Sequence, residues 1–169
     1  YASEYMDAEI YRDGFKFNLH FEKGENIGGL IKEPTTRKKT GTKIRWKPDL
    51  EVFTDINVSK EYFEDVIKRQ AIVNEGLLFV FREQQGARFI QQEIVYQNGI
   101  TDYVNEIVGE DKLSSVQFWQ TERKGRDRED KPEYKVKINV AMSFSNKNPM
   151  KEYYHNSSWL EHGGVPEKA

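Results

Sequence analysis

Apolar and polar residues alternate along several stretches of this chain. The alternation is clearest at residues 15–21, and an Asp13-Gly14 turn separates that run from a shorter one at residues 8–11. Asp-Gly between two alternating runs is a strong signal for a β-hairpin. We interpret residues 1–6 as the end of a helix and residues 22–39 as a loop.

A third strand is predicted at residues 42–46, where Thr42, Ile44 and Trp46 share one face. Pro48 ends this strand because it has no N–H to donate to a sheet. We expect Trp46 to pack in a core beside Ile44. Three basic residues share the opposite face: Lys43, Arg45 and Lys47.

The second part of the chain mixes helices with strands. Helical spacing predicts a helix over residues 60–74, capped by Ser59 and ended by Gly76, and a shorter helix over residues 98–107, ended by Gly109. Strands are predicted at residues 77–82, 88–96, 116–122 and 134–144, followed by an extended run at residues 150–160. In the strand at residues 134–144, four apolar side chains are expected to point inward: Val136, Ile138, Val140 and Met142. The order of elements indicates an α+β fold, with a boundary between two units near residues 48–57.

Composition excludes several classes of protein. The 169 residues have a net charge of −2, so any contact with DNA must come from a local basic patch. There is no cysteine, which fits a reducing cytoplasm and excludes thiolate catalysis and Cys-ligated zinc. No apolar run is long enough to span a membrane. A compact chain of this length buries about 70% of its unfolded surface, so we expect a substantial core.

The candidate chemical residues are weak signals when each is taken alone. Thr40-Gly41-Thr42 is by itself only a turn at the start of a strand. The loop at residues 124–133 mixes basic and acidic residues, and a solvated hairpin loop is its favoured interpretation. His155 and His162 are interpreted as loop histidines rather than metal ligands, so no metal site is expected.

Taken together, these segments resemble a known family. Residues 39–53 resemble the segment that closes the ATPase domain in the B subunits of bacterial gyrase and topoisomerase IV, where Thr-Gly-Thr is followed by a strand, an aromatic residue, Pro-Asp and then Phe. Residues 67–77 are similar to the family helix that ends in Phe-Leu-Asn-x-Gly-Leu. Residues 96–104 are similar to its Tyr-x-Gly-Gly-Ile-x-x-Phe-Val. The match covers most of the chain in order and spacing.

The resemblance implies a fragment of a type IIA DNA topoisomerase B subunit. Residues 1–50 would be the last strands of a GHKL-type ATPase domain. Residues 51–169 would be a transducer domain of ribosomal-protein-S5-like fold, incomplete at its C-terminus. The parent enzyme would use ATP and Mg²⁺, dimerise on binding ATP, and pass DNA together with a topoisomerase A subunit in the cytoplasm.

The same resemblance predicts which functional residues the chain carries. Thr42 would touch the adenine environment, and Thr40 and Gly41 would shape its turn. Transducer domains of the family face a DNA-sized cavity, so Lys124, Arg126 and Arg128 would be candidate contacts to a DNA backbone. The family's catalytic Glu, its Mg²⁺-binding Asn, its Gly-rich lid and its switch lysine would lie outside these residues. The fragment alone is therefore expected to be inactive and to bind no cofactor.

The chain departs from the family pattern at two places. Asn98 replaces the first Gly of Gly-Gly-Ile, and Val165-Pro166 follows Gly163-Gly164 where the family has Thr-His. Gyrase and topoisomerase IV both stay open as the parent, as does a divergent paralogue. Two other interpretations are an S5-like interaction module without ATPase activity and a segment of a MutL-type GHKL ATPase.

Overall fold

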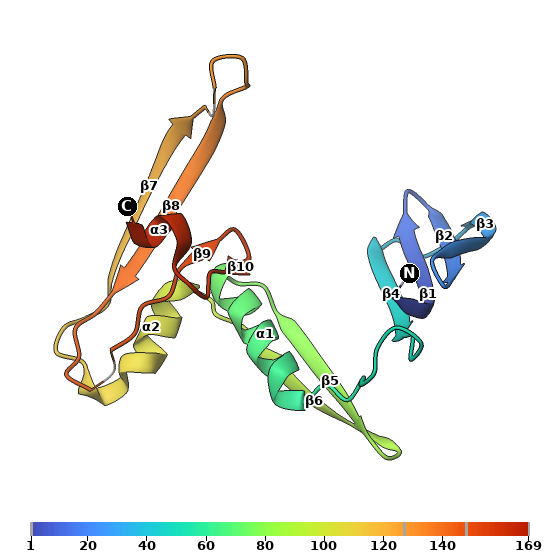
Figure 1. Cartoon of the computed structure of the whole chain (residues 1–169), viewed down its shortest axis with the longest axis horizontal. Coiled ribbons are helices and arrows are strands. Elements are labelled where there is room, and N and C mark those ends of the chain that lie inside the picture. The colour runs from blue at the N-terminus through green and yellow to red at the C-terminus, as the bar shows by residue number, and fades with distance from the viewer. Residues whose placement is uncertain (1, 127, 148, 169) are drawn as a thin grey trace. The chain divides into compact units, whose positions relative to one another are not determined.

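An antiparallel four-stranded sheet forms the first part of the computed structural model, which describes residues 2–126, 128–147 and 149–168. Its strands lie in the order β3-β2-β1-β4, so β3 and β4 are the two edges (Figure 1). Four residues lie outside the described ranges: Tyr1, where the helix end was expected, Asp127 of the charged loop, Asn148 and Ala169. The bounds of the four strands are Ser3–Arg12 for β1, Phe15–Glu22 for β2, Glu25–Pro34 for β3 and Gly41–Pro48 for β4.

Two-residue turns set the register of this sheet. Arg12 pairs with Phe15 across Asp13-Gly14, whose φ angles of 53° and 76° are those of a type I′ turn, so the predicted hairpin is confirmed. Lys23-Gly24 makes the same kind of turn, with φ angles of 47° and 90°, and leads into β3.

Two expectations for this region were wrong. Ser3–Met6 is strand rather than helix, because it pairs with both β2 and β4. Much of the expected loop at residues 22–39 is strand β3. The positive φ angles at Gly28 and Gly29 are accommodated where the β2–β3 register shifts, between Asn18 and His20.

The turn after β4 is held by a buried carboxylate. Asp49 is 6% exposed, and its side chain accepts a hydrogen bond from the backbone N–H of Glu51 at 2.9 Å. Its backbone carbonyl accepts hydrogen bonds from the N–H groups of Val52 and Phe53. The Pro-Asp pair in the sequence therefore ends the strand by providing acceptors for the following turn.

Helices and hairpins make up the rest of the chain. Contacts between residues divide it into Tyr1–Val58 and Ser59–Ala169, which we call unit 1 and unit 2. In unit 2, α1 packs against the β5–β6 hairpin, and α2 contacts β8 (Figure 1). The bounds of its elements are α1 Lys60–Val73, β5 Phe79–Gln85, β6 Arg88–Ile94, α2 Ile100–Val108, a 3₁₀ turn η1 Gly109–Asp111, β7 Gln117–Gly125, β8 Tyr134–Met142, β9 Tyr154–His155, β10 Ser158–Trp159 and α3 Gly164–Lys168.

The helix ends follow the capping residues that the sequence predicts. The Ser59 hydroxyl accepts the backbone N–H of Tyr62 at 3.3 Å and starts α1. Gly109 caps the end of α2 with φ 50°. Helix α1 ends at Val73 with Asn74 as its C-cap, within one residue of the predicted end. Gly76 follows with φ 72° and donates its N–H to the carbonyl of Tyr96.

The core is much smaller than expected. Only four apolar residues among those described are buried, with exposed fractions of 0–9%: Ala71, Ile72, Tyr96 and Val108. The accessible surface is 13585 Å², whereas two separate compact bodies of these lengths would expose about 10,000 Å². Uncovered sheet faces explain the excess. The four side chains of β8 expected to point inward are 37–53% exposed, and Trp46 is 56% exposed instead of packed.

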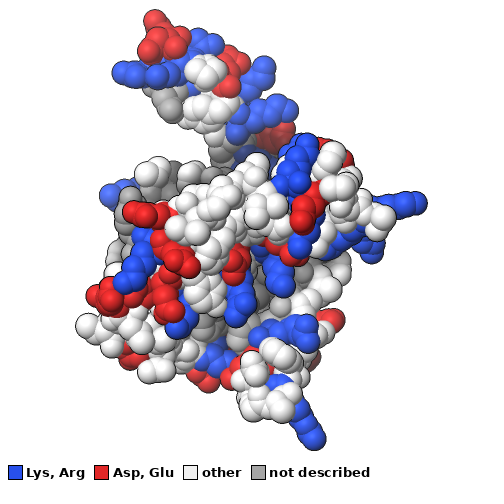
Figure 2. Space-filling model, turned by 90° about the vertical axis from the view of Figure 1, so that its right-hand side faces the viewer, with Lys and Arg blue, Asp and Glu red and all other residues white. Residues whose placement is uncertain are grey.

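Charge is mixed over the surface. Lys and Arg side chains are interspersed with Asp and Glu side chains over the face shown in Figure 2, as expected from the small net charge. Among the described residues, this face therefore shows no large area of a single charge (Figure 2). None of the described helices is long and apolar enough to cross a membrane.

Candidate functional site

The predicted nucleotide contact lies on the apolar face of unit 1. Thr42 of β4 lies opposite Ile10 of β1, and the alternation along β4 places Thr42 on the same face as Ile44 and Trp46. The apolar side chains of β2 share this face: Phe15, Phe17, Leu19 and Phe21. The side chains of Ile44 and Trp46 are 61% and 56% exposed. The Thr42 hydroxyl is thus presented at the edge of an open apolar surface that a flat, partly polar ring could cover.

Thr40 and Gly41 are adjacent to Thr42, as the sequence requires. Thr40 is exposed just before β4, and Gly41 is its first residue, opposite Tyr11. Gly41 does not have a left-handed φ, and a Cβ there would make only an ordinary contact of 3.6 Å with Arg37. A residue with a side chain could therefore occupy position 41 without backbone strain.

The predicted DNA contacts lie in unit 2, and each is close to a carboxylate. Lys124, at the end of β7, is 3.8 Å from Glu133, and Arg126 is 3.4 Å from the same side chain. Arg128 is 3.6 Å from Asp130. All three cations are exposed, so these contacts are weak and screened by salt. They nevertheless reduce the positive charge that the loop presents.

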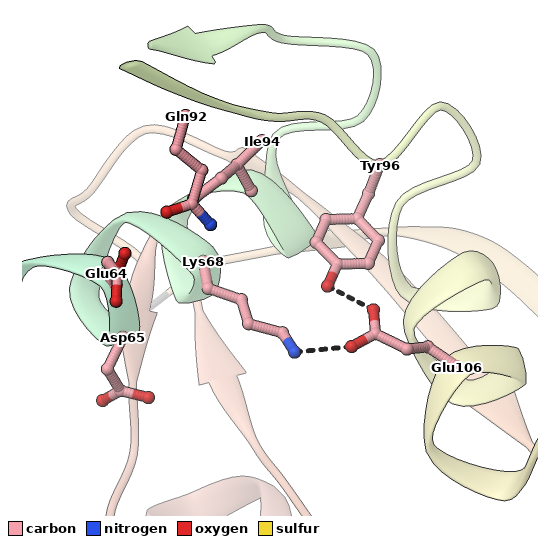
Figure 3. Close-up of a pocket in the computed structure, with 7 residues that line it drawn as sticks. All are labelled: Glu64, Asp65, Lys68, Gln92, Ile94, Tyr96 and Glu106. Atoms are coloured by element: carbon pink, nitrogen blue, oxygen red, sulfur yellow. Dashed lines mark hydrogen bonds and ion pairs between the residues drawn. The ribbon is translucent and has the colours of Figure 1, made fainter. Parts of the chain in front are cut away.

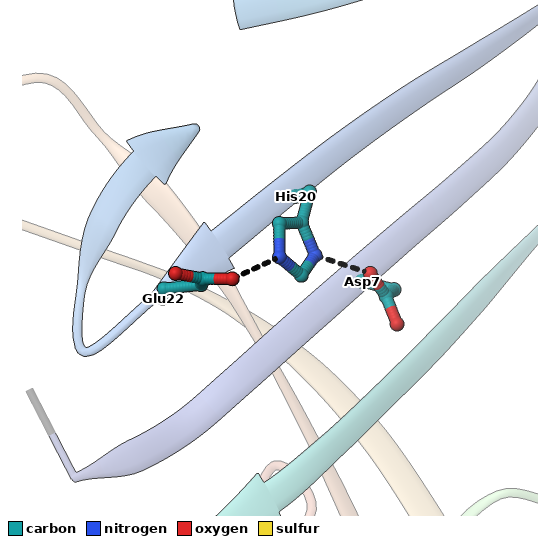
Figure 4. A network of polar contacts seen from close by, with 3 residues as sticks. All are labelled: Asp7, His20 and Glu22. Carbon is teal, nitrogen blue, oxygen red and sulfur yellow. Dashed lines mark hydrogen bonds and ion pairs between the residues drawn. The ribbon is translucent and has the colours of Figure 1, made fainter. Parts of the chain in front are cut away.

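A histidine network on the polar face of unit 1 was not anticipated. His20 in β2 contacts the carboxylate of Asp7 in β1 at 2.7 Å through Nδ1, and that of Glu22 at 3.3 Å through Nε2 (Figure 4). These hydrogen bonds, first to Asp7 and then to Glu22, raise the pKa of His20 above its usual value. The turn at Asp13-Gly14 fixes His20 opposite Asp7, so the hairpin register could have revealed the pair.

This network predicts a pH dependence of unit 1. Because the folded-state pKa of His20 is raised, its stabilising effect is fully present below its unfolded pKa of about 6.5 and is lost as the pH rises through the folded value. Backbone amides of β1 and β2 should therefore exchange faster at about pH 8 than at about pH 5.5, after correction for intrinsic rates. Hydrogen exchange followed by mass spectrometry measures this.

Matched variants separate the network from general effects of pH. His20→Gln should remove most of the difference between the two pH values. His162→Gln, which replaces an exposed histidine of unit 2, should leave it unchanged. A pH dependence that persists in His20→Gln would contradict the assignment.

A second polar network joins the two long helices of unit 2. Glu106 of α2 accepts hydrogen bonds from the Lys68 ammonium of α1 and from the Tyr96 hydroxyl, both at 2.6 Å (Figure 3). Burial opposes ionisation of Glu106, but these two donors lower its pKa below the usual value. Burial and the bond to Glu106 raise the pKa of Tyr96, so Tyr96 stays protonated and Glu106 ionised near neutral pH.

Tyrosines extend this network to the C-terminal hairpin. The Tyr103 ring packs edge-on against that of Tyr96, with centroids 6.0 Å apart. The hydroxyls of Tyr103 and Tyr154 donate to the carboxylate of Glu152 at 3.1 Å and 2.8 Å. Burial raises the pKa of Tyr103 to about 12, with a further contribution from Glu152. No sequence pattern signals these contacts, because they depend on how the helices pack.

The β9–β10 hairpin is also fixed to α1. The guanidinium of Arg69 lies 3.5 Å from the centroid of the Trp159 ring, and the Gln70 side chain donates to the carbonyl of Ser157 at 2.7 Å. Cation–π contacts of this kind contribute about 0.5–2 kcal/mol. The end of unit 2 is therefore attached to α1 through side chains rather than through a shared sheet.

The pocket beside this network is open and polar. It measures about 300 Å³, and its walls come from α1, β6, the following loop and α2 (Figure 3). Its lining residues are Glu64, Asp65, Lys68, Gln92, Ile94, Tyr96 and Glu106. Glu106 is already engaged by two donors, so the pocket does not assemble a free nucleophile and base. Within the described residues, no group of three or more His, Cys, Asp and Glu side chains is arranged to hold a metal ion.

Curated relatives match most of the chain. It is 28% identical over 103 residues to the B subunit of DNA gyrase from Synechocystis sp., covering 60% of this chain and 10% of that protein. It is 26% identical over 125 residues to the B subunit of DNA topoisomerase 4 from Enterococcus faecalis, covering 73% and 18%. It is 27% identical over 148 residues to the B subunit of DNA topoisomerase 4 from Staphylococcus aureus, covering 85% and 20%. The chain therefore spans about a fifth or less of the length of these relatives.

A solved structure shares the fold. The ATPase domain of Thermus thermophilus gyrase B, solved with an aminocoumarin, aligns with a TM-score of 0.63 and 23% identity, covering 83% of this chain and 36% of that one. No protein-family model matches the chain. The predicted resemblance to bacterial type IIA topoisomerase B subunits is confirmed by these matches, and the fold is α+β and dominated by sheets.

Proposed function

We propose that this chain is a segment of the B subunit of an ATP-dependent type IIA DNA topoisomerase, and that it relays the state of the nucleotide to DNA strand passage. The observation that carries the proposal is the extent of the similarity. It covers 148 residues, or 85% of the chain, in the relative from Staphylococcus aureus, and so includes both unit 1 and unit 2. A shared sheet alone would not produce a match that continues through the helices of unit 2.

In this proposal unit 1 is the end of the GHKL ATPase domain. The open apolar face of its sheet would be covered by helices from elsewhere in the longer polypeptide, which accounts for the exposure of Trp46. Thr42, with Thr40 and Gly41 before it, would contact the adenine ring at the edge of this face. ATP and Mg²⁺ would be held mostly by other residues of that polypeptide. Binding and hydrolysis of ATP there would supply the free energy for DNA strand passage.

Unit 2 would be the transducer domain, of ribosomal-protein-S5-like fold. Its polar networks join α1, α2 and the segment that contains the β9–β10 hairpin through hydrogen bonds, most of them to a carboxylate. Such bonds have directional geometry and are suited to holding elements in one arrangement. The parent enzyme would act on DNA together with a topoisomerase A subunit and dimerise on binding ATP. Lys124, Arg126 and Arg128 remain candidate contacts to the DNA backbone in that assembly.

The first test concerns nucleotide binding by the 169-residue chain itself. Because only Thr42 and its neighbours would touch the nucleotide, titration calorimetry with a non-hydrolysable ATP analogue and Mg²⁺ should show no heat of binding. Circular dichroism must first show that the chain is folded. Binding at micromolar concentration would mean that the 169-residue chain itself contains phosphate-binding residues. That result would contradict the proposal that most nucleotide contacts lie elsewhere in the longer polypeptide.

The second test concerns the activity of the longer polypeptide. Purified with its A-type partner, the polypeptide that contains this segment should supercoil relaxed DNA or decatenate linked circles, and it should do so only when ATP is present. Supercoiling or decatenation that proceeds without ATP would contradict the proposal, as would a folded complex that does neither when ATP is present. Comparing relaxed with catenated substrates would also distinguish a gyrase, which supercoils relaxed DNA, from a topoisomerase IV, which decatenates.

A further inference from the structure

Positive charge is concentrated in one part of unit 1. From Lys32 to Lys47 the sequence contains seven Lys and Arg residues and one carboxylate, Glu33. The structure places six of these cations along β4 and the segment before it, and all six are exposed. We call them the cationic edge: Arg37, Lys38, Lys39, Lys43, Arg45 and Lys47.

Strand geometry arranges three of these side chains in a row. Lys43, Arg45 and Lys47 alternate with Thr42, Ile44 and Trp46, so they share the polar face of the sheet. Successive members of the row are about 7 Å apart along β4, since a strand rises about 3.4 Å per residue. β4 is an edge of the sheet, so one side of the row is not bordered by another strand of unit 1.

The nearest carboxylates on the neighbouring strand are already occupied. Glu9 lies opposite Lys43 but contacts Lys16 at 2.8 Å. Asp7 lies opposite Arg45 but contacts His20 at 2.7 Å. The β1 carboxylates opposite Lys43 and Arg45 are therefore engaged by side chains of β2, and the positive charge of Lys43 and Arg45 is left at the edge.

The arginines are held by aromatic rings instead of carboxylates. The guanidinium of Arg45 lies 5.4 Å from the centroid of the Tyr5 ring, and that of Arg37 lies 4.1 Å from that of Tyr11. A cation–π contact orients a guanidinium without neutralising it. Within the described parts of the chain, Lys47 is the member of the cationic edge that pairs with a carboxylate, Glu4, at 2.6 Å.

We propose that the cationic edge binds the phosphodiester backbone of duplex DNA. Three cations in a row over about 13 Å face about four phosphates of one strand, since a duplex carries one phosphate per 3.4 Å on each strand. Contacts of this kind position a protein on DNA without reading its sequence. The choice of DNA rests on the proposed function. The geometry favours this surface over the loop of unit 2, because all three loop cations lie beside a carboxylate, whereas among the described residues Lys43 and Arg45 do not share Lys47's pairing.

The test compares two triple variants of the intact chain, using fluorescence anisotropy of a short labelled duplex at several salt concentrations. The edge variant is Lys43→Gln, Arg45→Gln and Lys47→Gln. The loop variant is Lys124→Gln, Arg126→Gln and Arg128→Gln. Both remove three positive charges, so general electrostatic attraction falls equally. Circular dichroism checks that each variant is folded.

The edge variant should bind duplex DNA about tenfold or more weakly at low salt, and its slope of log K against log salt should fall by about 2–3. The loop variant should change affinity by less than about threefold. Equal losses in the two triple variants, or a larger loss in the loop variant, would overturn the proposal. So would equal competition by polyglutamate of the same charge, which would indicate an acidic protein segment as the partner.

The outcome is independent of the tests of the proposed function. ATP-dependent strand passage by the longer polypeptide, combined with an edge variant that still binds DNA normally, would reject the cationic edge alone. Loss of DNA binding in the edge variant without ATP-dependent strand passage would keep the DNA surface and reject the assignment to a topoisomerase.

Discussion

Replacing Ile72 with alanine is expected to unfold unit 2 in a large fraction of molecules. Ile72 is 2% exposed and is the largest fully buried side chain among the described residues. It packs with Ala71 and Tyr96, and partly buried side chains of β5, β6 and α2 surround them. Truncating a buried isoleucine costs about 2–5 kcal/mol, and a small domain has about 5–15 kcal/mol of stability in total. With so few buried residues, unit 2 has little stability to lose.

Urea unfolding followed by circular dichroism measures this effect. The matched control is Ile90→Ala, which removes the same atoms from a side chain on β6 that is 49% exposed. We expect the control to change the free energy of unfolding by less than about 1 kcal/mol. Similar losses in the two variants would mean that Ile72 is not the centre of the core.

Replacing Gly99 with alanine should be the second most damaging change. Gly99 precedes α2 with φ 51° and ψ −125°, outside the regions open to residues with a side chain. Holding such a residue there costs about 1–3 kcal/mol. An added Cβ would also lie 3.2 Å from the carbonyl oxygen of Ile72 and 3.4 Å from the Cβ of Glu75, both near the end of α1.

Gly109 provides a control with nearly the same backbone. It follows α2 with φ 50° and ψ −134°, but a Cβ there would have no neighbour within 4 Å. Gly109→Ala should therefore show the cost of the backbone alone. Gly99→Ala should exceed it by about 1 kcal/mol or more, because the junction of the two helices must also shift. Equal unfolding free energies would show that the contact with Ile72 relaxes without cost.

The same position explains one departure from the family pattern. Asn98 stands where the family has the first of two glycines, and its φ is not positive, so a side chain is tolerated. Its amide donates to Asp102 at 3.0 Å, and its backbone N–H donates to the same carboxylate at 2.8 Å. The second glycine has the positive φ. This departure therefore leaves the local fold intact.

Local signals predicted most of the elements, and long-range packing accounts for the errors. The Asp13-Gly14 hairpin, the Ser59 cap and the Gly109 helix end each depend on neighbouring residues, and each is confirmed. β3 was missed because Lys-Gly is not among the residue pairs preferred in type I′ turns, and because Gly28-Gly29 suggested a loop. The alternation at Trp46 correctly identified an apolar face, but no pattern in the sequence says what covers a face.

The candidate site shows the same limit. The pairing of His20 with Asp7 follows from the length of one turn and was within reach of the sequence. The contact of Glu106 with Lys68 joins residues 38 positions apart on two helices, and nothing in the spacing of either helix predicts it. The cationic edge lies between these cases. Its residues were visible as two separate basic runs, and only the register of β4 against β1 places them together beside occupied carboxylates.

The pairing of β4 also has a consequence for how the sheet of unit 1 assembles. β1, β2 and β3 are joined by two-residue turns, so each can find its neighbour within microseconds. β4 instead pairs with β1 across a span that runs from Tyr11–Gly41 to Ser3–Pro48. Closing that loop costs more chain entropy than closing a hairpin, so we expect β4 to join last. On a growing chain, the strand with the densest positive charge would then remain a free, unpaired segment until the sheet before it is complete.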